Sequence, residues 1–393
     1  MIAGPSLALS SRCDLVMQSE IRAMSVECSR VGGINLSQGV CDTPVPQPVV
    51  EGAIDAVLRG SNTYTAHSGV RMLRDAIAIK QQRFTGMDVD AETGIIVSAG
   101  ATGAMYCSFM ALLDPGDEVI LFEPFYGYHV ATLRAVEAVP VYVPLIPPEW
   151  AFDMARLEAA VTPRTRAILV NTPVNPSGKV FSRNELLLLA GFAERHDLFV
   201  FTDEMYEHFL FDGRKHVSIA TLPGMRERTI TVSGLSKTFS ITGWRIGYAM
   251  CDPKWAAAIG NFNDLVYVCA PSPLQMGVAA GLLALGDDYY LGLADEYGEK
   301  RDHFCKALAQ AGLAPYVPEG AYYVLADVSH LPGADPREKA MHILRRTGVA
   351  SVPGSAFYHD HRGDEVVRFC FAKEAHVLAE AGDRLMRLRS PES

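Results

Sequence analysis

The chain has 393 residues, of which 49% are hydrophobic and 20% are charged. This balance is typical of a globular protein of one to three domains and excludes disorder as its main feature. The formal net charge of −10 at pH 7 argues against nucleic acid or an anionic membrane as the main partner.

The first twelve residues, MIAGPSLALSSR, have no basic residue before their short apolar stretch, so they are a poor signal peptide. Longer apolar runs, such as residues 277–285, are too short to span a bilayer. The eight cysteines are irregularly spaced and form no C-x-x-C pair, which favours free thiols in a reducing compartment. We therefore expect a soluble, cytoplasmic protein without a bound metal.

Three prolines at alternate positions, Pro44, Pro46 and Pro48, predict an extended strip that crosses between two structural units. Between about residues 50 and 290, short apolar runs alternate with helical patterns such as 103–113 and 183–196. The expected strands are 95–98, 118–122, 139–143, 167–170, 198–202, 229–233 and 246–250. This alternation predicts an α/β fold with a mostly parallel sheet covered by helices on both faces.

The C-terminal part of the chain has a different pattern. A long helix is expected near residues 287–311, followed by strands at 322–327 and 366–372 with a helix between them. This order predicts a smaller α+β unit.

Functional side chains follow five of the expected strands, where ligands bind in open parallel sheets. The segments concerned are Ala99–Gly103, Glu123–Tyr128, Asn171–Gly178, Asp203–Tyr206 and Gly234–Lys237. The first of them opens a helix, whose free N–H groups and dipole favour a phosphate. A plain turn is the alternative, and the G-x-G-x-x-G pattern of dinucleotide-binding folds is not met.

Each of the other groups also has an ordinary structural explanation. Lys237 lies in the sequence Ser-Lys-Thr, which lacks the glycine that a P-loop requires before the lysine. Taken alone, this segment therefore favours a surface lysine. Asp203 could cap a helix, Asn175 could shape a turn, and Arg245 could form a surface ion pair. Tyr126 and Tyr206 could be core aromatics with satisfied hydroxyls.

Arg368 is more informative, because the strand 366–372 has apolar residues on both faces. A charge in such a strand needs an anionic partner. Alternation would direct the neighbouring acid, Glu365, to the opposite face, so the partner is either a distant acid or a ligand carboxylate. The triplet His359-Asp360-His361 could ligate a metal, but its polar surroundings favour a solvated loop.

Taken together, these segments resemble a known family. Ser236–Gly247 resembles the lysine segment of class I/II aminotransferases, which are pyridoxal-phosphate enzymes of fold type I. Asn175–Gly178, Asp203–Tyr206 and Val366–Arg368 resemble the other landmarks of that family in the same order, and the similarity runs from about Ile34 to Arg368. The motifs are most similar to those of the kynurenine, glutamine and aromatic branch and of the aspartate aminotransferase-like branch.

The resemblance implies a role for each landmark residue. Lys237 would hold pyridoxal 5'-phosphate as an aldimine, Asp203 would pair with the ring nitrogen, and Asn175 and Tyr206 would hydrogen-bond the phenolic oxygen. Tyr126 would stack on the ring. The phosphate would be held by Gly100, Ala101, Thr102, Ser236, Arg245 and, from the neighbouring subunit of a homodimer, Tyr64. Gly39, Asn175 and Arg368 would bind the substrate, with Arg368 on its carboxylate.

The implied reaction is ping-pong transamination between an amino acid and a 2-oxo acid, with Lys237 as the acid–base catalyst. Neutral, aromatic or aspartate-type amino acids are the expected substrates, and Tyr126, Tyr128, Phe357 and Tyr358 would line an apolar pocket or the core. Gly234 stands where many members have serine, so we expect a slightly altered phosphate site. The resemblance also implies a large domain over residues 48–290 and a small domain built from 1–47 and 291–393.

Two other functions are compatible with these residues. A cysteine-conjugate β-lyase would use the same cofactor and lysine. A non-catalytic regulator built on this fold would need a DNA-binding unit, for which residues 1–33 leave little room, and the chain is acidic.

Overall fold

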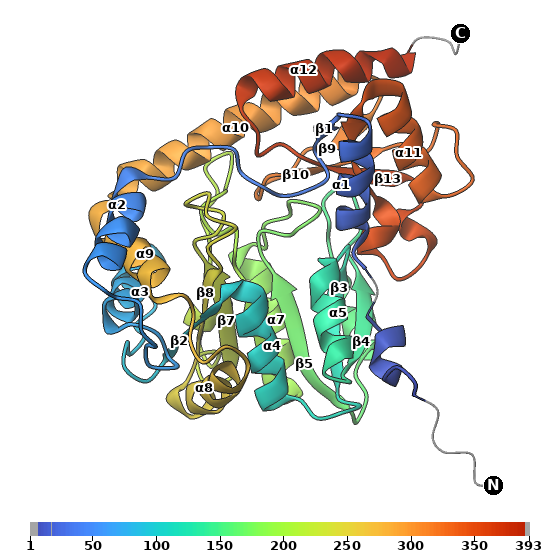
Figure 1. The fold of residues 1–393 in the computed structure, drawn as a ribbon. Coiled ribbons are helices and arrows are strands. Elements are labelled where there is room, and N and C mark those ends of the chain that lie inside the picture. Colours follow the sequence, from blue (N-terminus) through green and yellow to red (C-terminus); the bar gives the residue numbers. More distant parts are fainter. Residues whose placement is uncertain (1–6, 17, 390–393) are drawn as a thin grey trace, which may run out of the picture.

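The computed structural model describes residues 7–16 and 18–389. Seven strands form a central sheet (Figure 1). In sheet order they are β2 (Ile95–Ala99), β8 (Ile246–Met250), β7 (Thr229–Gly234), β6 (Phe199–Asp203), β5 (Thr165–Asn171), β3 (Glu118–Glu123) and β4 (Val139–Pro144). The strands from β7 to β4 are parallel, whereas β8 is antiparallel to both of its neighbours. The predicted mostly parallel sheet of the α/β class is confirmed.

Helices cover both faces of this sheet, because neighbouring residues of each strand point to opposite faces. On one face, Leu121 and Leu169 pack in a core with side chains of α4, α5 and α8. On the other, Ile120 and Ile168 pack with side chains of α7. The helices of this part are α2 (Gln47–Leu58), α3 (Arg71–Phe84), α4 (Gly100–Leu112), α5 (Gly127–Ala135), α6 (Met154–Ala159), α7 (Arg183–Arg195), α8 (Pro253–Tyr267) and α9 (Ser272–Ala284).

A second, antiparallel sheet is built from the C-terminal part of the chain in the order β12 (Val352–Pro353), β13 (Val366–Cys370), β10 (Tyr323–Asp327) and β9 (Ala314–Tyr316). It packs with α10 (Asp287–Gln310), α11 (Pro336–Thr347) and α12 (Ala375–Leu385). The N-terminal α1 (Glu20–Arg30) joins the same core through Met24 and Cys28, and β1 (Ile34–Asn35) pairs with β11 (Val349–Ala350). The predicted domain bounds, 48–290 against the two termini, stay a prediction.

One difference from the expected elements matters for the site. Helix α4 begins at Gly100 and not at residue 103, directly after the last residue of β2. Gly100 has φ +77°, a conformation that favours glycine, so strand and helix meet without a loop. The first N–H groups of α4 therefore lie at the sheet edge itself.

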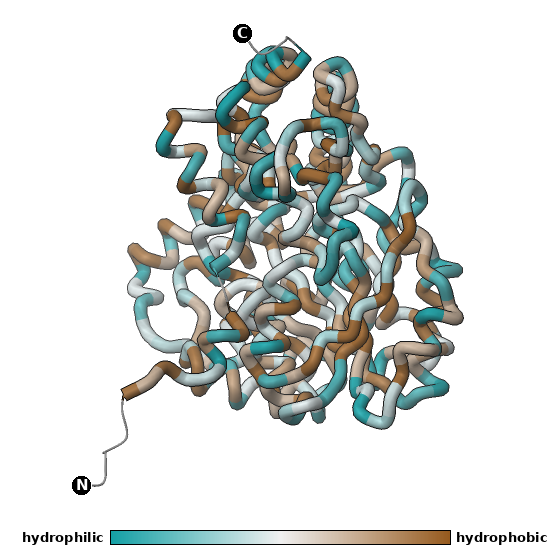
Figure 2. Tube along the Cα trace, turned by 90° about the vertical axis from the view of Figure 1, so that its right-hand side faces the viewer, coloured by the Kyte–Doolittle hydropathy of each residue, from teal (hydrophilic) through white to brown (hydrophobic). Residues whose placement is uncertain are grey.

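Hydrophobic stretches are frequent in the middle of the trace, whereas hydrophilic and hydrophobic stretches alternate along its outline (Figure 2). Within the described residues, we find no helix with the length and apolar character needed to cross a membrane.

Candidate active site

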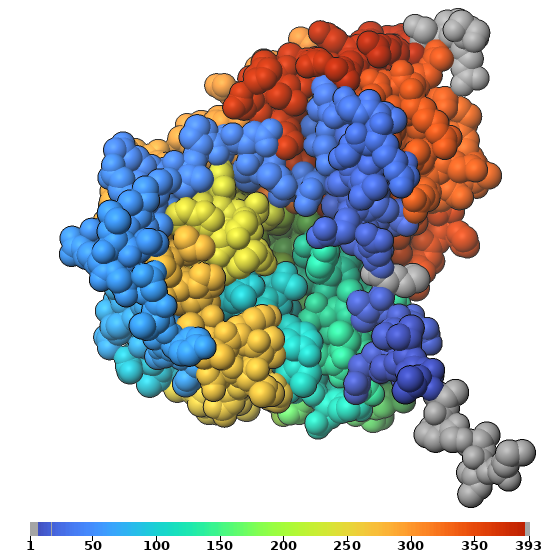
Figure 3. Space-filling view, in the orientation of Figure 1, coloured from blue at the N-terminus to red at the C-terminus, as the bar shows by residue number. Residues whose placement is uncertain are grey.

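A cavity of about 450 Å³ lies at the carboxyl ends of the parallel strands. In the space-filling view, the face seen in Figure 1 is hollowed near its centre, below the blue stretch that runs from α1 to α2 (Figure 3). Of the predicted site residues, only Gly100 and Tyr64 do not line this cavity. The others all do: Gly39, Ala101, Thr102, Tyr126, Asn175, Asp203, Tyr206, Ser236, Lys237, Arg245 and Arg368. Gly39 and Arg368, which are 329 positions apart in the chain, thus line one cavity at the place where open α/β sheets bind ligands.

Lys237 lies in the turn that follows β7, and its Nζ donates a hydrogen bond to the carbonyl oxygen of Gly39 at 2.8 Å. Burial lowers the pKa of this ammonium, and the positive charges of Arg245 and Arg368 lower it further. An amine with a lowered pKa is more often unprotonated, and hence able to act as a nucleophile or a base. The position therefore fits a chemical role better than that of a surface lysine.

Asp203 is the last residue of β6, and its carboxylate has two partners. Its Oδ2 lies 2.8 Å from Nε2 of His129, and its Oδ1 accepts a hydrogen bond from the Met205 N–H at 3.1 Å. His129 was not anticipated from the sequence, because its partner lies 74 positions away. The only sequence signal was its place three residues after Tyr126, on the helix that Tyr126 caps. This histidine orients a buried carboxylate toward the cavity.

Arg368 is 1% exposed, yet none of the ion pairs among the described residues involves it. Its Nη1 donates to Oδ1 of Asn175 at 2.8 Å and its Nη2 to the carbonyl oxygen of Ser37 at 2.6 Å. Its Nε is buried without a partner. Of the two partners considered from the sequence, a distant acid is thus not found within the described residues, and the free donors suit a ligand carboxylate.

The opposite end of the cavity offers donors for a small anion. The guanidinium of Arg245 lies against Gly100, since a Cβ on that glycine would sit 2.2 Å from Nη2 of the arginine. Ser236 Oγ is buried and has no hydrogen-bond partner among the described residues. Ala101 and Thr102 lie in the first turn of α4, next to these groups. Arg245 itself has φ +57°, a backbone strain of the kind found at functional sites.

Gly234 has a packing reason that the sequence did not reveal. It pairs with Gly247 across β7 and β8, and a Cβ on Gly234 would lie 3.0 Å from the Cα of Gly247 and 3.0 Å from the carbonyl oxygen of Ile246. The neighbouring Ser233 donates to Glu207 at 2.8 Å and does not line the cavity. A serine hydroxyl is therefore not supplied from either position.

The aromatic side chains considered for an apolar pocket divide into two groups. Tyr126 and Tyr128 line the cavity and stack on each other, with ring centroids 5.3 Å apart. Phe357 is fully buried beneath Arg368, and Tyr358 faces an adjoining cavity of about 700 Å³. The sequence also missed Ile21, Arg22, Gln38, Met105 and Tyr323, which form part of the wall. For Ile21, Arg22 and Tyr323 no signal was available, because α1 and β10 reach the cavity only through the tertiary fold.

Tyr64 lies outside this cavity and is 82% exposed. Its predicted role concerns the neighbouring subunit of a dimer, so a single chain does not test it. Gly100 contributes its backbone to the start of α4, behind Ala101.

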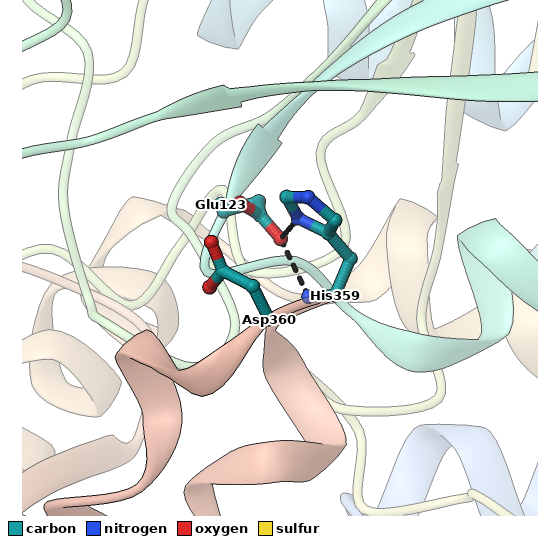
Figure 4. Close-up of side chains that lie close together, drawn as sticks. All are labelled: Glu123, His359 and Asp360. Atoms are coloured by element: carbon teal, nitrogen blue, oxygen red, sulfur yellow. Dashed lines mark hydrogen bonds and ion pairs between the residues drawn. The ribbon is translucent and has the colours of Figure 1, made fainter.

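The triplet His359-Asp360-His361 is divided by the fold. His359 donates its backbone N–H to the buried carboxylate of Glu123 at 2.7 Å, and its Nδ1 lies at the same distance from that oxygen (Figure 4). Asp360 lies beside them, whereas His361 is exposed and pairs with Asp364. Arg362 bonds both Glu123 and Asp360. A cation of the chain itself thus joins this cluster, which fastens the segment before β13 to the end of β3.

Comparisons with known proteins agree with this geometry. Residues 31–385 match the family model described as "Aminotransferase class I and II". The chain is 37% identical over 373 residues to the probable N-succinyldiaminopimelate aminotransferase DapC of Mycobacterium tuberculosis, covering 92% of this chain and 94% of the relative. It is 33% identical over 388 residues to kynurenine–oxoglutarate transaminase 1 of Homo sapiens, covering 90% and 92%. The structure of Thermus thermophilus aspartate aminotransferase with maleate matches with a TM-score of 0.90 at 32% identity, covering 97% and 100% of the two chains.

Proposed function

Because this chain belongs to the class I and II aminotransferases, which depend on pyridoxal 5'-phosphate, we propose that its cavity exchanges amino groups between amino acids and 2-oxo acids by a ping-pong reaction. The family and the fold type I architecture expected from the motifs are confirmed. One observation supports the proposed use of this cavity more than any other. It brings an amine with a lowered pKa, a buried carboxylate and an arginine that has no acidic partner among the described residues into one space, at Lys237, Asp203 and Arg368.

The residues present fit the cofactor. Lys237 would hold it covalently, and the Asp203 carboxylate would face its ring nitrogen. Asn175 and Tyr206 would bind its phenolic oxygen, and Tyr126 would cover its ring. The phosphate would be held by Gly100, Ala101, Thr102, Ser236 and Arg245, among which the unpartnered Ser236 hydroxyl and the bare Cα of Gly100 leave donors and room. When bound, the cofactor supplies an electron sink that acidifies the C–H bond next to the substrate amine.

The remaining work falls to side chains of this chain. Arg368 has five N–H donors and uses two of them internally, so it can bind the substrate α-carboxylate through its free donors. That contact fixes which bond at Cα faces the cofactor. Nζ of Lys237, once the substrate amine has taken its place on the cofactor, would be free to remove the Cα proton, which its lowered pKa favours. The donor and the acceptor acid both need Arg368, so they must occupy the cavity in turn, as ping-pong kinetics requires.

The apolar part of the cavity lining suggests the substrate class. Ile21, Met105, Tyr126 and Tyr128 offer apolar and aromatic surface, which suits neutral and aromatic amino acids. A spectrophotometric screen of half-reactions with about twenty amino acids tests this assignment. Fastest conversion of a neutral or aromatic donor is expected, and exclusive use of aspartate or glutamate would overturn it.

An aspartate-type substrate needs a cation for its second carboxylate, and Arg22 is the candidate. It is exposed on α1 at the cavity rim, and its guanidinium has no ion-pair or hydrogen-bond partner within the described part of the chain. Arg22→Gln should slow dicarboxylic substrates by roughly tenfold and leave neutral ones unchanged. Arg30→Gln, which removes an exposed arginine of the same helix that pairs with Glu27, is the matched control. An equal response of both substrate classes would exclude Arg22 from this role.

We also propose a cytoplasmic homodimer in which Tyr64 reaches the phosphate of the neighbouring subunit. Its support is the exposure of Tyr64 together with exposed apolar side chains on α2 and at the end of α8, namely Ile54, Val57, Leu58, Leu265, Val266 and Val268. Sedimentation at assay concentration tests the dimer. A fully active monomer would remove Tyr64 from the neighbour's site.

A further inference from the structure

Tyr323 lies between the two ends of the cavity and belongs to none of the motifs found in the sequence. It opens β10 and is 3% exposed, and it lines the cavity. Its hydroxyl oxygen is 3.0 Å from that of Tyr206, 117 positions earlier in the chain. Its ring centroid is 4.2 Å from Cζ of Arg368. One side chain thus touches a residue at the cofactor end and a residue at the carboxylate end.

We propose that Tyr323 is a positioning residue that acts through two separable parts: its hydroxyl orients Tyr206 toward the cofactor, and its ring holds Arg368 toward the substrate carboxylate. This inference rests on the proposed roles of Tyr206 and Arg368. It adds Tyr323, a residue to which the sequence motifs assign no role.

The hydroxyl part follows from the hydrogen-bond inventory. Tyr206 is buried, and within the described residues the Tyr323 hydroxyl is the one hydrogen-bond partner of the Tyr206 hydroxyl. A phenol can donate one hydrogen bond and accept others. If Tyr323 donates to the Tyr206 oxygen, the Tyr206 proton is free to point into the cavity. Hydrogen bonds in such a chain polarise one another, which makes the terminal hydroxyl a stronger donor.

The position of Tyr323 is fixed by close packing. A Cβ on Gly39 would lie 1.9 Å from the Tyr323 hydroxyl oxygen, so the phenol rests against the bare Cα of that glycine. The Gly39 carbonyl accepts from Lys237, as described above, and from Tyr322 at 3.3 Å. Any larger residue at 39 would displace the phenol from Tyr206.

The ring part follows from the surroundings of Arg368. The guanidinium lies over the rings of Tyr323 and Phe357, with Cζ 4.2 and 4.9 Å from their centroids. Cation–π contact of this kind favours a desolvated guanidinium and restricts the plane of its donors. The hydrogen bonds to Asn175 and Ser37 fix the positions of Nη1 and Nη2 of Arg368. The remaining donors are therefore held in one direction before a ligand arrives.

Two substitutions separate the parts. Tyr323→Phe keeps the ring and removes the hydroxyl, whereas Tyr323→Leu removes both. Tyr316→Phe is the matched control, because Tyr316 is a tyrosine of the adjacent strand β9 that does not line the cavity. Each protein is loaded with pyridoxal 5'-phosphate, and three quantities are measured: the pH midpoint of the cofactor absorption change, the rate of cofactor release, and KM.

Tyr323→Phe should raise the pH midpoint by about half a unit and speed cofactor release by roughly two- to tenfold, with KM unchanged. The sign follows because a weaker donor leaves the cofactor's phenolic oxygen more basic, so it retains a shared proton to higher pH. Tyr323→Leu should add an increase in KM of roughly tenfold. The control should match the parent in all three quantities. An unchanged midpoint in Tyr323→Phe, or a KM in Tyr323→Leu equal to that of Tyr323→Phe, overturns the corresponding part.

A double-mutant cycle with Tyr206→Phe distinguishes this inference from the proposed function. If Tyr323 acts through Tyr206, adding Tyr323→Phe to Tyr206→Phe should cause no further change in the midpoint. Additive changes would show that Tyr323 acts independently, which overturns the inference and leaves the proposed function intact. A parent protein that does not bind pyridoxal 5'-phosphate would overturn the proposed function itself, and this inference with it.

Discussion

Replacement of Arg368 is the most informative substitution at the substrate end of the cavity. The parent arginine uses two of its five N–H donors on Asn175 and Ser37, which leaves a fork for the α-carboxylate. Arg368→Lys keeps the charge and loses the fork, and Arg368→Ala loses both. The two variants therefore separate charge from geometry.

The magnitude follows from the number of bonds lost. A hydrogen bond to a charged group contributes about 1.5–3 kcal/mol. Loss of one such bond in Arg368→Lys should lower kcat/KM by roughly 10- to 150-fold, and loss of two in Arg368→Ala by roughly 10²- to 10⁴-fold. The alanine variant also leaves Oδ1 of Asn175 without its donor.

The assay compares an amino acid with its α-amide in single half-reactions. Both variants should lose rate with the acid and change little with the amide, because only the acid carries the charge that Arg368 binds. Arg301→Lys is the matched control, since Arg301 is a buried arginine of α10 that pairs with Asp212 outside the cavity. Urea unfolding of each variant excludes a general loss of structure. Equal kinetics for parent, lysine and alanine proteins would refute the assignment.

Two further predictions concern buried ionisable groups. Asp203→Asn should lower kcat by roughly 10²-fold or more, because a neutral side chain would no longer stabilise positive charge on the cofactor ring. His129→Phe removes the Nε2 partner of Asp203 but keeps the carboxylate, so it should lower kcat less; the opposite order in stopped-flow half-reactions would contradict this. Burial and the adjacent Lys80 ammonium lower the pKa of His208 to about 3. Between about pH 3 and about 6.5, the imidazole is therefore protonated in the unfolded chain and neutral in the folded one. The free energy of unfolding thus falls by about 1.4 kcal/mol for each pH unit as the pH falls through this window. His208→Phe should therefore lose less stability than the parent between pH 7 and pH 5 in urea unfolding followed by circular dichroism, and parallel losses would exclude His208 as the cause.

Local sequence patterns were sufficient for the sheet and for the groups at its edge. A short apolar run such as 167–170 favours a buried strand. The residues that follow parallel strands of this kind are expected at one edge of the sheet. Lys237 and Asp203 were placed at that edge for this reason, whereas their expected roles came from the resemblance to the family. The antiparallel direction of β8 was not visible, since strand periodicity is the same in both directions.

Contacts between distant segments could not be predicted. His129 meets Asp203 across 74 positions and Tyr206 meets Tyr323 across 117, and neither pair leaves a local pattern. The requirement for glycine at 234 depends on the approach of β8 to β7, which only the sheet register reveals. The residues proposed to bind the cofactor directly follow from motifs, whereas the residues proposed to orient them follow from the tertiary structure.

The covalent attachment of the coenzyme gives the most direct test of the whole account. Protein loaded with pyridoxal 5'-phosphate is reduced with borohydride, digested, and mapped by mass spectrometry. The account predicts that the pyridoxyl label is found on Lys237 and that Lys237→Ala abolishes it. A label on another lysine, or a protein that takes up no coenzyme when it is supplied in excess, would contradict it.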